Sequence, residues 1–400
     1  MVKVARLAGM LMVAATAGAQ EPAAELPVTP NTKLFAKIER TIIRIHSIFA
    51  RPLHPVIGSV APGGGWGAGL GYTAPTRGPW EFNAKGLWTL KNYQLAEAIL
   101  GYHGRRAELE GYGRYRDMNR LDYFGPGPAS NLFDRTTFSL KDPVVGAHGK
   151  FRVLPWIALG GRVEELWPRE GPGERLPSID QRFTPIQAPG LFTSTRFGRF
   201  QASVDVHLPA SAGDAFYQGT RSRVTYAIYD HHDDVELFNF KRLDLEAQQT
   251  LAGFGAHHRL TLSGWASTSM TDDGQEVPYF LQRTLGGKSE LRSVHEDRLG
   301  SDGTDATLRG YRDLRFRDRN LLLLQAEYRV PLWGPIDATV FADAGKVTPT
   351  RGDLDLNDLR RDFGFSLSVM KGWVTPARID VGFGSGEGTR IYLSLGDLTP

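Results

Sequence analysis

The sequence lacks cysteine entirely. This absence excludes a disulfide framework, a thiol nucleophile and a thiolate-bound metal. A strong excess of one charge is also missing, since 47 lysines and arginines oppose 44 aspartates and glutamates, a formal net charge of +3 over 400 residues. Dedicated nucleic-acid binders usually carry a marked basic excess, so nucleic acid is not expected as a partner. Beyond the N-terminus, no run approaches the roughly 18 apolar residues of a membrane-spanning helix.

Residues 1–19 predict a secretory signal peptide. Lys3 and Arg6 form a basic start, residues 7–16 are mostly apolar, and residues 17–19 (Ala-Gly-Ala) offer a small-residue cleavage site. We expect the mature chain to begin at Gln20 and to leave the cytoplasm. Its destination is then the periplasm, the medium, or an outer membrane crossed by strands.

Residues 20–51 predict a tail followed by a short amphipathic helix. Between residues 33 and 49 apolar residues recur at helical spacing, with Lys37, Arg40 and Arg44 between them. Such a helix caps the fold, lies on the membrane surface, or sits inside a pore. The residues alone leave these alternatives open.

From about residue 65 the apolar residues recur at every second position, which indicates β-strands. In segment 336–345, for example, apolar residues occupy the even positions, and Asp337 and Asp343 lie on the opposite face. A soluble periplasmic sandwich has the same period. The strand length of about ten residues, the signal peptide and the aromatic residues near strand ends favour a transmembrane barrel, apolar toward lipid and polar toward a lumen. The predicted fold class is therefore an all-β, transmembrane antiparallel β-barrel over residues 52–400.

Fifteen strands are recognisable, and single-chain bacterial barrels close with an even number, so we expect sixteen. The sixteenth is expected near 52–60, and the three longest connections, 118–133, 168–190 and 271–319, are expected on the extracellular side. The fifteen strands are expected at 65–74, 80–91, 93–103, 106–117, 134–153, 155–167, 191–208, 219–231, 236–250, 257–270, 320–331, 336–347, 361–371, 375–385 and 389–398.

Three stretches resemble the BamA/TamA-type superfamily of outer-membrane barrels, also called the bacterial surface antigen family. They are "VPYFLQRTLGG" (277–287), "LRGYRDLRFRDRNLLLLQAEYRVPL" (308–332) and "VFADAGKV" (340–347). "LDYFGPGPAS" (121–130) and "GSGEGTRIYLSLG" (384–396) are also similar to the family. The resemblance implies a sixteen-stranded barrel that inserts or translocates polypeptides, or in a few members handles lipids.

The resemblance also implies a lock between a loop and the barrel lumen. The family's sixth extracellular loop folds inward and carries an Arg-Gly-aromatic tip, here Arg309, Gly310 and Tyr311. The family pairs this arginine with acidic residues on the inner wall, here Glu327 and Asp343. Asp343 belongs to a Phe-x-Asp-x-Gly motif that also contains Phe341 and Gly345. A guanidinium suits such a site because it stays charged and presents forked donors, and we expect Gly310 to permit a tight turn.

The other arginines of this stretch, Arg315, Arg317 and Arg319, are expected to line the lumen. There they would balance the inward-facing acids Glu81, Glu108, Glu110, Asp244 and Glu246. Arg292, earlier in the same loop, is a rival for Arg309, although it lacks the following glycine and aromatic residue.

Two features depart from the family. Residues 20–64 leave no room for a polypeptide-transport-associated domain of about 75 residues, so we expect the short subgroup that lacks such periplasmic domains. The terminal strand normally ends on an aromatic residue, where this chain has Leu398.

No motif indicates covalent chemistry. "DHHDD" (230–234) offers imidazoles and carboxylates, but adjacent residues on a strand point apart, so we interpret it as a charged turn rather than a metal site. No G-x-S-x-G motif is present. We expect no cofactor, no metal and no enzymatic activity. The expected contacts are outer-membrane lipid, periplasmic or outer-membrane proteins, and a polypeptide or lipid client. The alternatives are a passive or helix-plugged channel and, less favoured, an outer-membrane hydrolase.

Overall fold

The computed structural model describes residues 52–75, 78–210, 217–232, 237–255, 257–287, 306–371, 374–384 and 386–395. The predicted signal peptide and the predicted amphipathic helix lie outside these ranges. Within them, no helix is long and apolar enough to cross a membrane.

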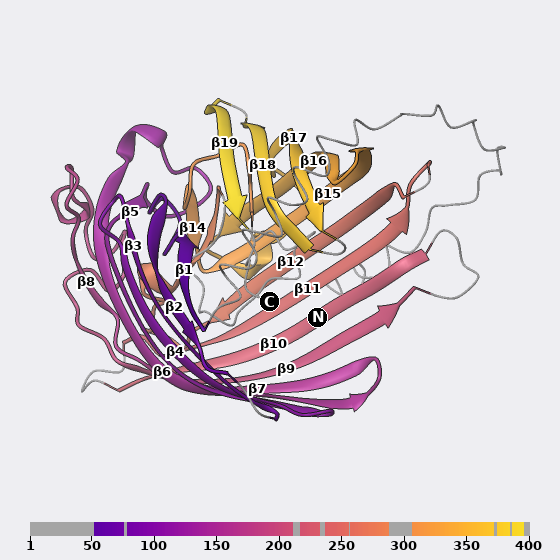
Figure 1. Cartoon of the computed structure of the whole chain (residues 1–400). Coiled ribbons are helices and arrows are strands. Elements are labelled where there is room, and N and C mark those ends of the chain that lie inside the picture. The colour runs from indigo at the N-terminus through magenta and orange to yellow at the C-terminus, as the bar shows by residue number, and fades with distance from the viewer. Residues whose placement is uncertain are drawn as a thin grey trace. The chain divides into compact units, whose positions relative to one another are not determined.

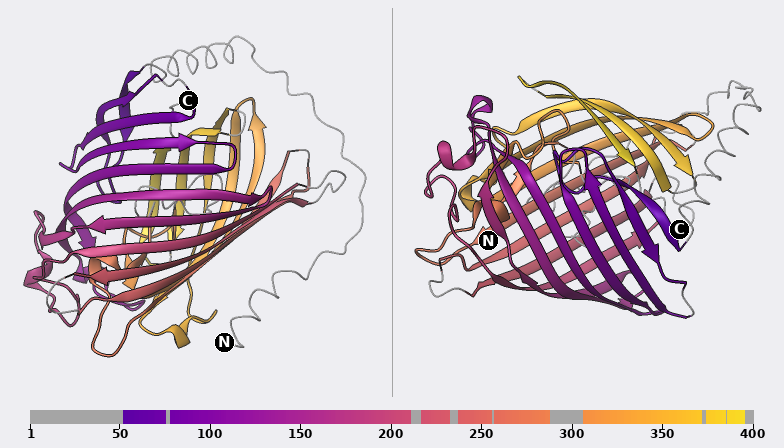
Figure 2. Two further views of the ribbon diagram at one scale, coloured as in Figure 1. Left: turned by 90° about the horizontal axis from the view of Figure 1, so that it is seen from below. Right: turned by 60° about the vertical axis from the view of Figure 1, so that its left-hand side comes forward.

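The chain builds one large sheet in which every strand pairs antiparallel with its neighbour (Figure 1). This sheet has seventeen strands. One of them, the four-residue β8 (Arg169–Pro172), pairs with β6 directly after β7 and so continues β7 along the same neighbour. Sixteen strands therefore make up the wall, and both views in Figure 2 show it curving round an interior. They are β1 (Leu53–Gly58), β2 (Gly67–Thr73), β3 (Trp80–Thr89), β4 (Gln94–His103), β5 (Ala107–Tyr123), β6 (Thr136–Leu154), β7 (Ile157–Leu166), β9 (Phe197–Pro209), β10 (Tyr217–His231), β11 (Phe240–Ala252), β12 (Arg259–Met270), β15 (Asn320–Trp333), β16 (Ile336–Thr348), β17 (Arg360–Lys371), β18 (Val374–Gly384) and β19 (Gly388–Leu395).

Burial in the wall is the reverse of that in a soluble protein. On β16, Val340 is 58% exposed, whereas its neighbours Phe341 and Asp343 are buried. Leu70 and Phe363, each 63% exposed, repeat the pattern on β2 and β17. Because a soluble sandwich turns its apolar side chains toward a dry centre, this arrangement suits a wall covered by lipid. The predicted fold class, an all-β transmembrane barrel of sixteen strands, is confirmed.

One strand continues well beyond its expected end. β5 runs on to Tyr123, 17 residues in all, whereas the 19 residues of β6 are close to the expected segment 134–153. At this end Met118, Leu121 and Tyr123 are buried. Connecting segments cover the strands at this end. The alternation of outward apolar and inward polar residues, which marks a lipid-facing strand, is therefore lost there, although the hydrogen bonds between β5 and β6 continue. The sequence pattern therefore ended β5 several residues too early.

The interior holds an apolar cluster at the end with the long connections and a polar cavity elsewhere. In the cluster, the Tyr279 ring lies 5.5 Å from Tyr123 and 4.9 Å from Phe138, and Phe183 packs edge-on against Tyr123. The cavity has a volume of ≈ 230 Å³. Its lining carries both signs of charge, including Glu110, Asp205, Arg162, Arg223 and Asp244.

The lipid-facing wall predicts how a charge would act on its outer face. We expect Ala342→Arg, on the exposed face of β16, to destabilise the barrel by about 2–4 kcal/mol, because a charge near the bilayer centre loses its hydration. Ala342→Leu is the matched control and should be neutral or mildly stabilising. Denaturant unfolding in phosphatidylcholine vesicles measures both. An arginine variant as stable as the wild type would contradict a lipid-covered face.

Candidate functional site

The segment between β12 and β15 turns back into the barrel. Its described part contains a 3-10 turn (Tyr279–Leu281) and a short hairpin of β13 (Arg283–Leu285) and β14 (Phe316–Asp318), which packs against β15 and β16. Every residue of both short strands is buried. The predicted loop tip, Arg309 to Tyr311, lies between these strands and is buried as well.

Arg309 is surrounded by groups from β15 and β16. Its side chain is fully buried, and its Nε and Nη2 donate to the two carboxylate oxygens of Asp343 at 2.8 and 2.7 Å. Its Nη1 donates to Glu327, and the guanidinium carbon lies 3.5 Å from the ring centroid of Phe341. The guanidinium thus has a bidentate carboxylate, a second carboxylate and an aromatic face as partners.

This environment keeps Arg309 charged. Burial alone lowers the pKa of a guanidinium, but the carboxylates of Asp343 and Glu327 raise the pKa of Arg309 above its ordinary value. The side chain therefore acts as a permanent cation inside the barrel, and moving it out would leave two buried carboxylates without their main partner.

The register of the wall places the two predicted acids diagonally. Glu327 faces Phe341 directly across the β15–β16 ladder, and Asp343 faces Gln325. The two acids are therefore diagonal neighbours, separated by the ring of Phe341. Arg309 spans this diagonal, and Gln325 donates to Asp343 at 3.0 Å.

The cluster extends further than the sequence prediction, to β17 and β18. Arg378 donates to Glu327 at 3.1 Å and to Asp380 at 2.8 Å, and Ser366 donates to Asp380 at 2.6 Å. Arg309 and Arg378 therefore share Glu327. The inward alternation of 361–371 and 377–384 placed these side chains in the lumen, but nothing in the sequence indicated that they join the same network.

Gly310 is needed for a different reason from the one predicted. Its backbone has no positive φ, so no tight left-handed turn requires glycine there. A Cβ on Gly310 would lie 2.3 Å from the backbone nitrogen of Gly384, and a Cβ on Gly382 would lie 2.5 Å from the carbonyl oxygen of Arg309. The loop tip thus packs backbone against backbone on β18, at a contact that only glycines allow.

Tyr311 and Gly345, the remaining predicted site residues, also lie at the contact between loop and wall. The Tyr311 hydroxyl donates to the carbonyl of Arg361, and its own carbonyl accepts from the Tyr392 hydroxyl of β19 at 2.6 Å. A Cβ on Gly345 would lie 3.1 Å from Leu285 of β13. The structure therefore brings all seven predicted site residues to one loop–wall contact, while the rival Arg292 lies outside the described residues.

The other arginines of the loop have partners that the sequence did not indicate. Arg315 forms an ion pair with Glu387 in the β18–β19 turn and donates to the side chain and the carbonyl of Ser130, both at 2.7 Å. Arg319 pairs with Glu276 of its own loop at 2.9 Å. The predicted pairing of Arg315 and Arg319 with acids of β3, β5 and β11 is therefore wrong. Arg315 instead joins the β5–β6 connection to the last hairpin of the barrel.

Arg317 and the histidines of "DHHDD" have different surroundings. Arg317 donates to the carbonyl of Tyr279 and lies over the ring of Phe138. His231 packs between aromatic rings, and His232 contacts Glu165 at 3.3 Å. No group of three or more histidines, aspartates or glutamates in the described ranges is arranged to hold a metal ion.

Comparison with solved structures shows where this fold is found. BamA from Haemophilus ducreyi lacking POTRA domains 1–3 superimposes with a TM-score of 0.52 at 13% sequence identity, over 90% of this chain and 76% of that one. CdiB from Acinetobacter baumannii superimposes with a TM-score of 0.51 at 9% identity, over 86% of this chain and 59% of that one. No family model matches the sequence, and no curated protein matches it. The chain therefore has a BamA-like outer-membrane barrel fold.

Removing the central cation should release the loop. We expect Arg309→Ala to destabilise the folded state by about 3–5 kcal/mol, because it leaves buried carboxylates uncompensated. We also expect proteases to cleave between β12 and β15 in this variant. Arg319→Ala removes a half-exposed pair from the same loop and should change stability by only about 0–1 kcal/mol. Limited proteolysis of the detergent-solubilised barrel compares the two variants. Equal cleavage rates would falsify the role of Arg309 in holding the loop inside the barrel.

The stability losses caused by Arg309→Ala and Asp343→Asn should be non-additive in the double variant, since the two groups are in contact.

The glycine contact predicts a steric effect. We expect Gly310→Ala to destabilise the loop by about 1–3 kcal/mol, because its Cβ would overlap the backbone of β18. Gly352→Ala is a suitable control, since a Cβ there has only Thr350 Oγ1 within reach, at 3.9 Å. Denaturant unfolding should separate the two variants, and identical midpoints would show that the loop tip is not packed on β18.

Proposed function

We propose that this barrel inserts or translocates a polypeptide or lipid client in the outer membrane, without covalent catalysis. The observation that carries the proposal is the in-folded loop, which is attached both to the wall and to the last hairpin. Arg309 holds it to β15 and β16, and Arg315, Tyr311 and Gly310 hold it to β18 and β19. A loop attached in this way gives the lumen a defined internal element and controls how freely β18 and β19 move.

The fold supports the same proposal. Barrels of the BamA and CdiB kind share this fold, as the comparisons above report. The inner wall around Arg309 contains arginines and carboxylates paired in a network, an arrangement suited to holding the loop rather than to bond cleavage.

A passive channel is the second candidate, favoured by the charged cavity inside the barrel. The apolar cluster at the loop end opposes it, because Tyr123, Phe138 and Tyr279 pack together there. Planar-bilayer recording separates the candidates. We expect the wild type to show no steady open conductance and Arg309→Ala to show increased, fluctuating conductance. A stable open pore in the wild type would favour the channel.

The insertion proposal predicts that tying the loop to the last hairpin blocks activity. Because the chain has no cysteine, Arg315→Cys with Glu387→Cys supplies the only thiols, and a cleavable bifunctional thiol reagent can then join them. We expect the cross-linked barrel in liposomes to lose the ability to accelerate membrane insertion of a urea-unfolded outer-membrane barrel protein. Insertion is measured by the heat-dependent gel mobility of the inserted client, and reductant should restore it.

The control for this experiment cross-links a different pair in the same loop. Arg319→Cys with Glu276→Cys joins two loop residues that do not contact β18 or β19. Its insertion rate should not change on cross-linking. If both cross-linked proteins insert the client as fast as their reduced forms, movement of the last hairpin relative to the loop is not part of the mechanism.

A further inference from the structure

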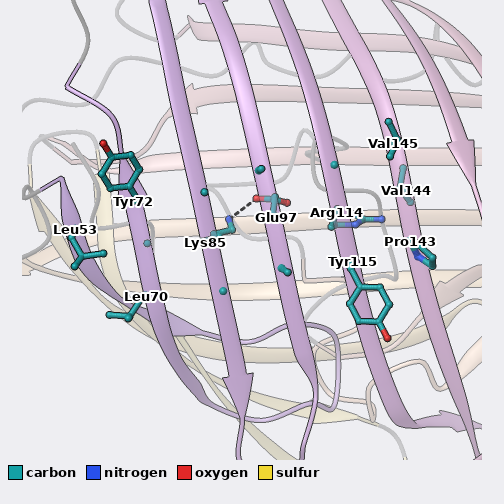
Figure 3. Close-up of a pocket in the computed structure, with 16 residues that line it drawn as sticks. Leu53, Leu70, Tyr72, Lys85, Glu97, Arg114, Tyr115, Pro143, Val144 and Val145 are labelled. Carbon is teal, nitrogen blue, oxygen red and sulfur yellow. Dashed lines mark ion pairs between the residues drawn. The ribbon is translucent and has the colours of Figure 1, made fainter.

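The outer face of β1–β6 contains an apolar groove (Figure 3). Its volume is ≈ 560 Å³, which is within the range of about 300–1,000 Å³ typical of ligand sites. Leu53, Leu70 and Tyr72 lie along one side, and Tyr115 and Val145 lie along the other (Figure 3). Between them the strands carry only small outward residues, namely Ala84, Gly86, Ala96, Ala98 and Gly113. The groove therefore exists because glycine and alanine take the place of bulky residues on three adjacent strands, β3, β4 and β5.

The charged residues that line the groove belong to the lumen side of the wall. Lys85 and Glu97 form an ion pair 3.0 Å long between β3 and β4, and Arg114 and Glu97 are almost completely buried. Figure 3 shows this pair between the two apolar sides of the groove. What an occupant meets from outside is thus apolar, as an acyl chain requires.

Cations gather at the extracellular edge of the same strands. Lys141 and Arg169 are directly opposite each other on β6 and β8, two residues beyond Pro143 at the groove's edge. Arg120 lies nearby on β5 and donates to the carbonyl of Lys91 in the β3–β4 turn. Asp117 is the acid beside them, 3.7 Å from Lys141. Lys141 and Arg169 together outnumber Asp117, which favours an anionic group at this edge.

We propose that this groove binds an anionic lipid of the outer leaflet, with acyl chains on the glycine and alanine floor and the phosphate between Lys141 and Arg169. The fold argues for a lipid as the occupant, because the exposed apolar faces of these strands lie in the membrane. The order along the strands agrees, because Lys141 and Arg169 lie between the apolar groove and the end of the barrel that carries the long connections. The inference depends on the fold and not on the client of the proposed function.

The floor offers variants that fill the groove without disturbing the barrel. A Cβ on Gly113 would meet nothing within 4 Å, and one on Gly86 would meet only a carbonyl oxygen at 3.8 Å. Gly111, two residues earlier on β5, is equally open but lines a neighbouring hollow of ≈ 710 Å³. Gly113→Leu and Gly86→Leu thus test the groove, and Gly111→Leu is the matched control.

Binding is measured by native mass spectrometry of the delipidated full chain in detergent. The probes are phosphatidylglycerol and phosphatidylcholine with identical acyl chains. We expect the wild type to bind phosphatidylglycerol about tenfold more tightly, which is about 1.4 kcal/mol. Lys141→Gln with Arg169→Gln should remove this preference, whereas Lys241→Gln, an exposed lysine on β11, should keep it. Gly113→Leu and Gly86→Leu should each lower the affinity for both lipids at least fivefold. Gly111→Leu should leave both affinities within twofold of the wild type.

Heat-dependent gel mobility verifies that each variant is folded, and Gly86→Leu replaces Gly113→Leu if the latter is not. Equal affinity of the wild type for the two lipids overturns the assignment of an anionic lipid. Unchanged lipid binding in a folded groove variant overturns the site. A groove variant that alters self-association but not lipid binding assigns the groove to a second copy of the chain, which also overturns the proposal.

Discussion

The buried guanidinium of Arg309, between the carboxylates of Asp343 and Glu327, determines where the in-folded loop sits inside the barrel. Arg309 is fully buried, so its charge has to be matched within a few ångströms, and the diagonal of Asp343 and Glu327 provides that match with forked geometry. This requirement fixes the depth and direction of the loop tip. The close approach of Gly310 to Gly384, the Tyr311–Tyr392 hydrogen bond and the Arg315–Glu387 ion pair all depend on the tip being at that depth.

Buried ion pairs of this kind specify an arrangement more than they stabilise it. The desolvation of two acids and an arginine offsets most of their attraction, whereas removing one partner leaves an uncompensated charge. The network therefore penalises any alternative position of the loop. The outer face of the wall does not depend on specific pairs. Its exposed leucines, valines and phenylalanines form an apolar surface that meets lipid. The groove next to Lys141 and Arg169 differs from the rest of this surface because cations lie beside it.

The sequence was most informative where one physical rule acts along the strand. The two-residue period of segments such as 336–345 comes from lipid on one side and lumen on the other, and it located the wall strands closely, including the end of β12 and the start of β15. It ended β5 too early because connecting segments bury Leu121 and Tyr123 beyond Met118. The roles of Gly310 and Arg315 were not predictable from local pattern, since both depend on β18 and β19, about seventy residues further along the chain. Arg378 was placed in the lumen, but only the three-dimensional register shows that it shares Glu327 with Arg309.

The attachments of the loop divide into two groups with different consequences. The attachments to β15 and β16 involve fully buried charges. They would be lost only if the whole loop left the barrel interior. Those to the last hairpin are the Arg315–Glu387 ion pair, the Tyr311–Tyr392 hydrogen bond and the backbone packing of Gly310 on Gly384. Arg309 also lies 3.8 Å from Asp380 of β18. Arg378 of β18 shares Glu327 with Arg309, so the hairpin and the loop separate only if this network rearranges. If the barrel admits a client through its wall, as proposed above, β18 and β19 have to break these contacts while Asp343 holds Arg309 in place.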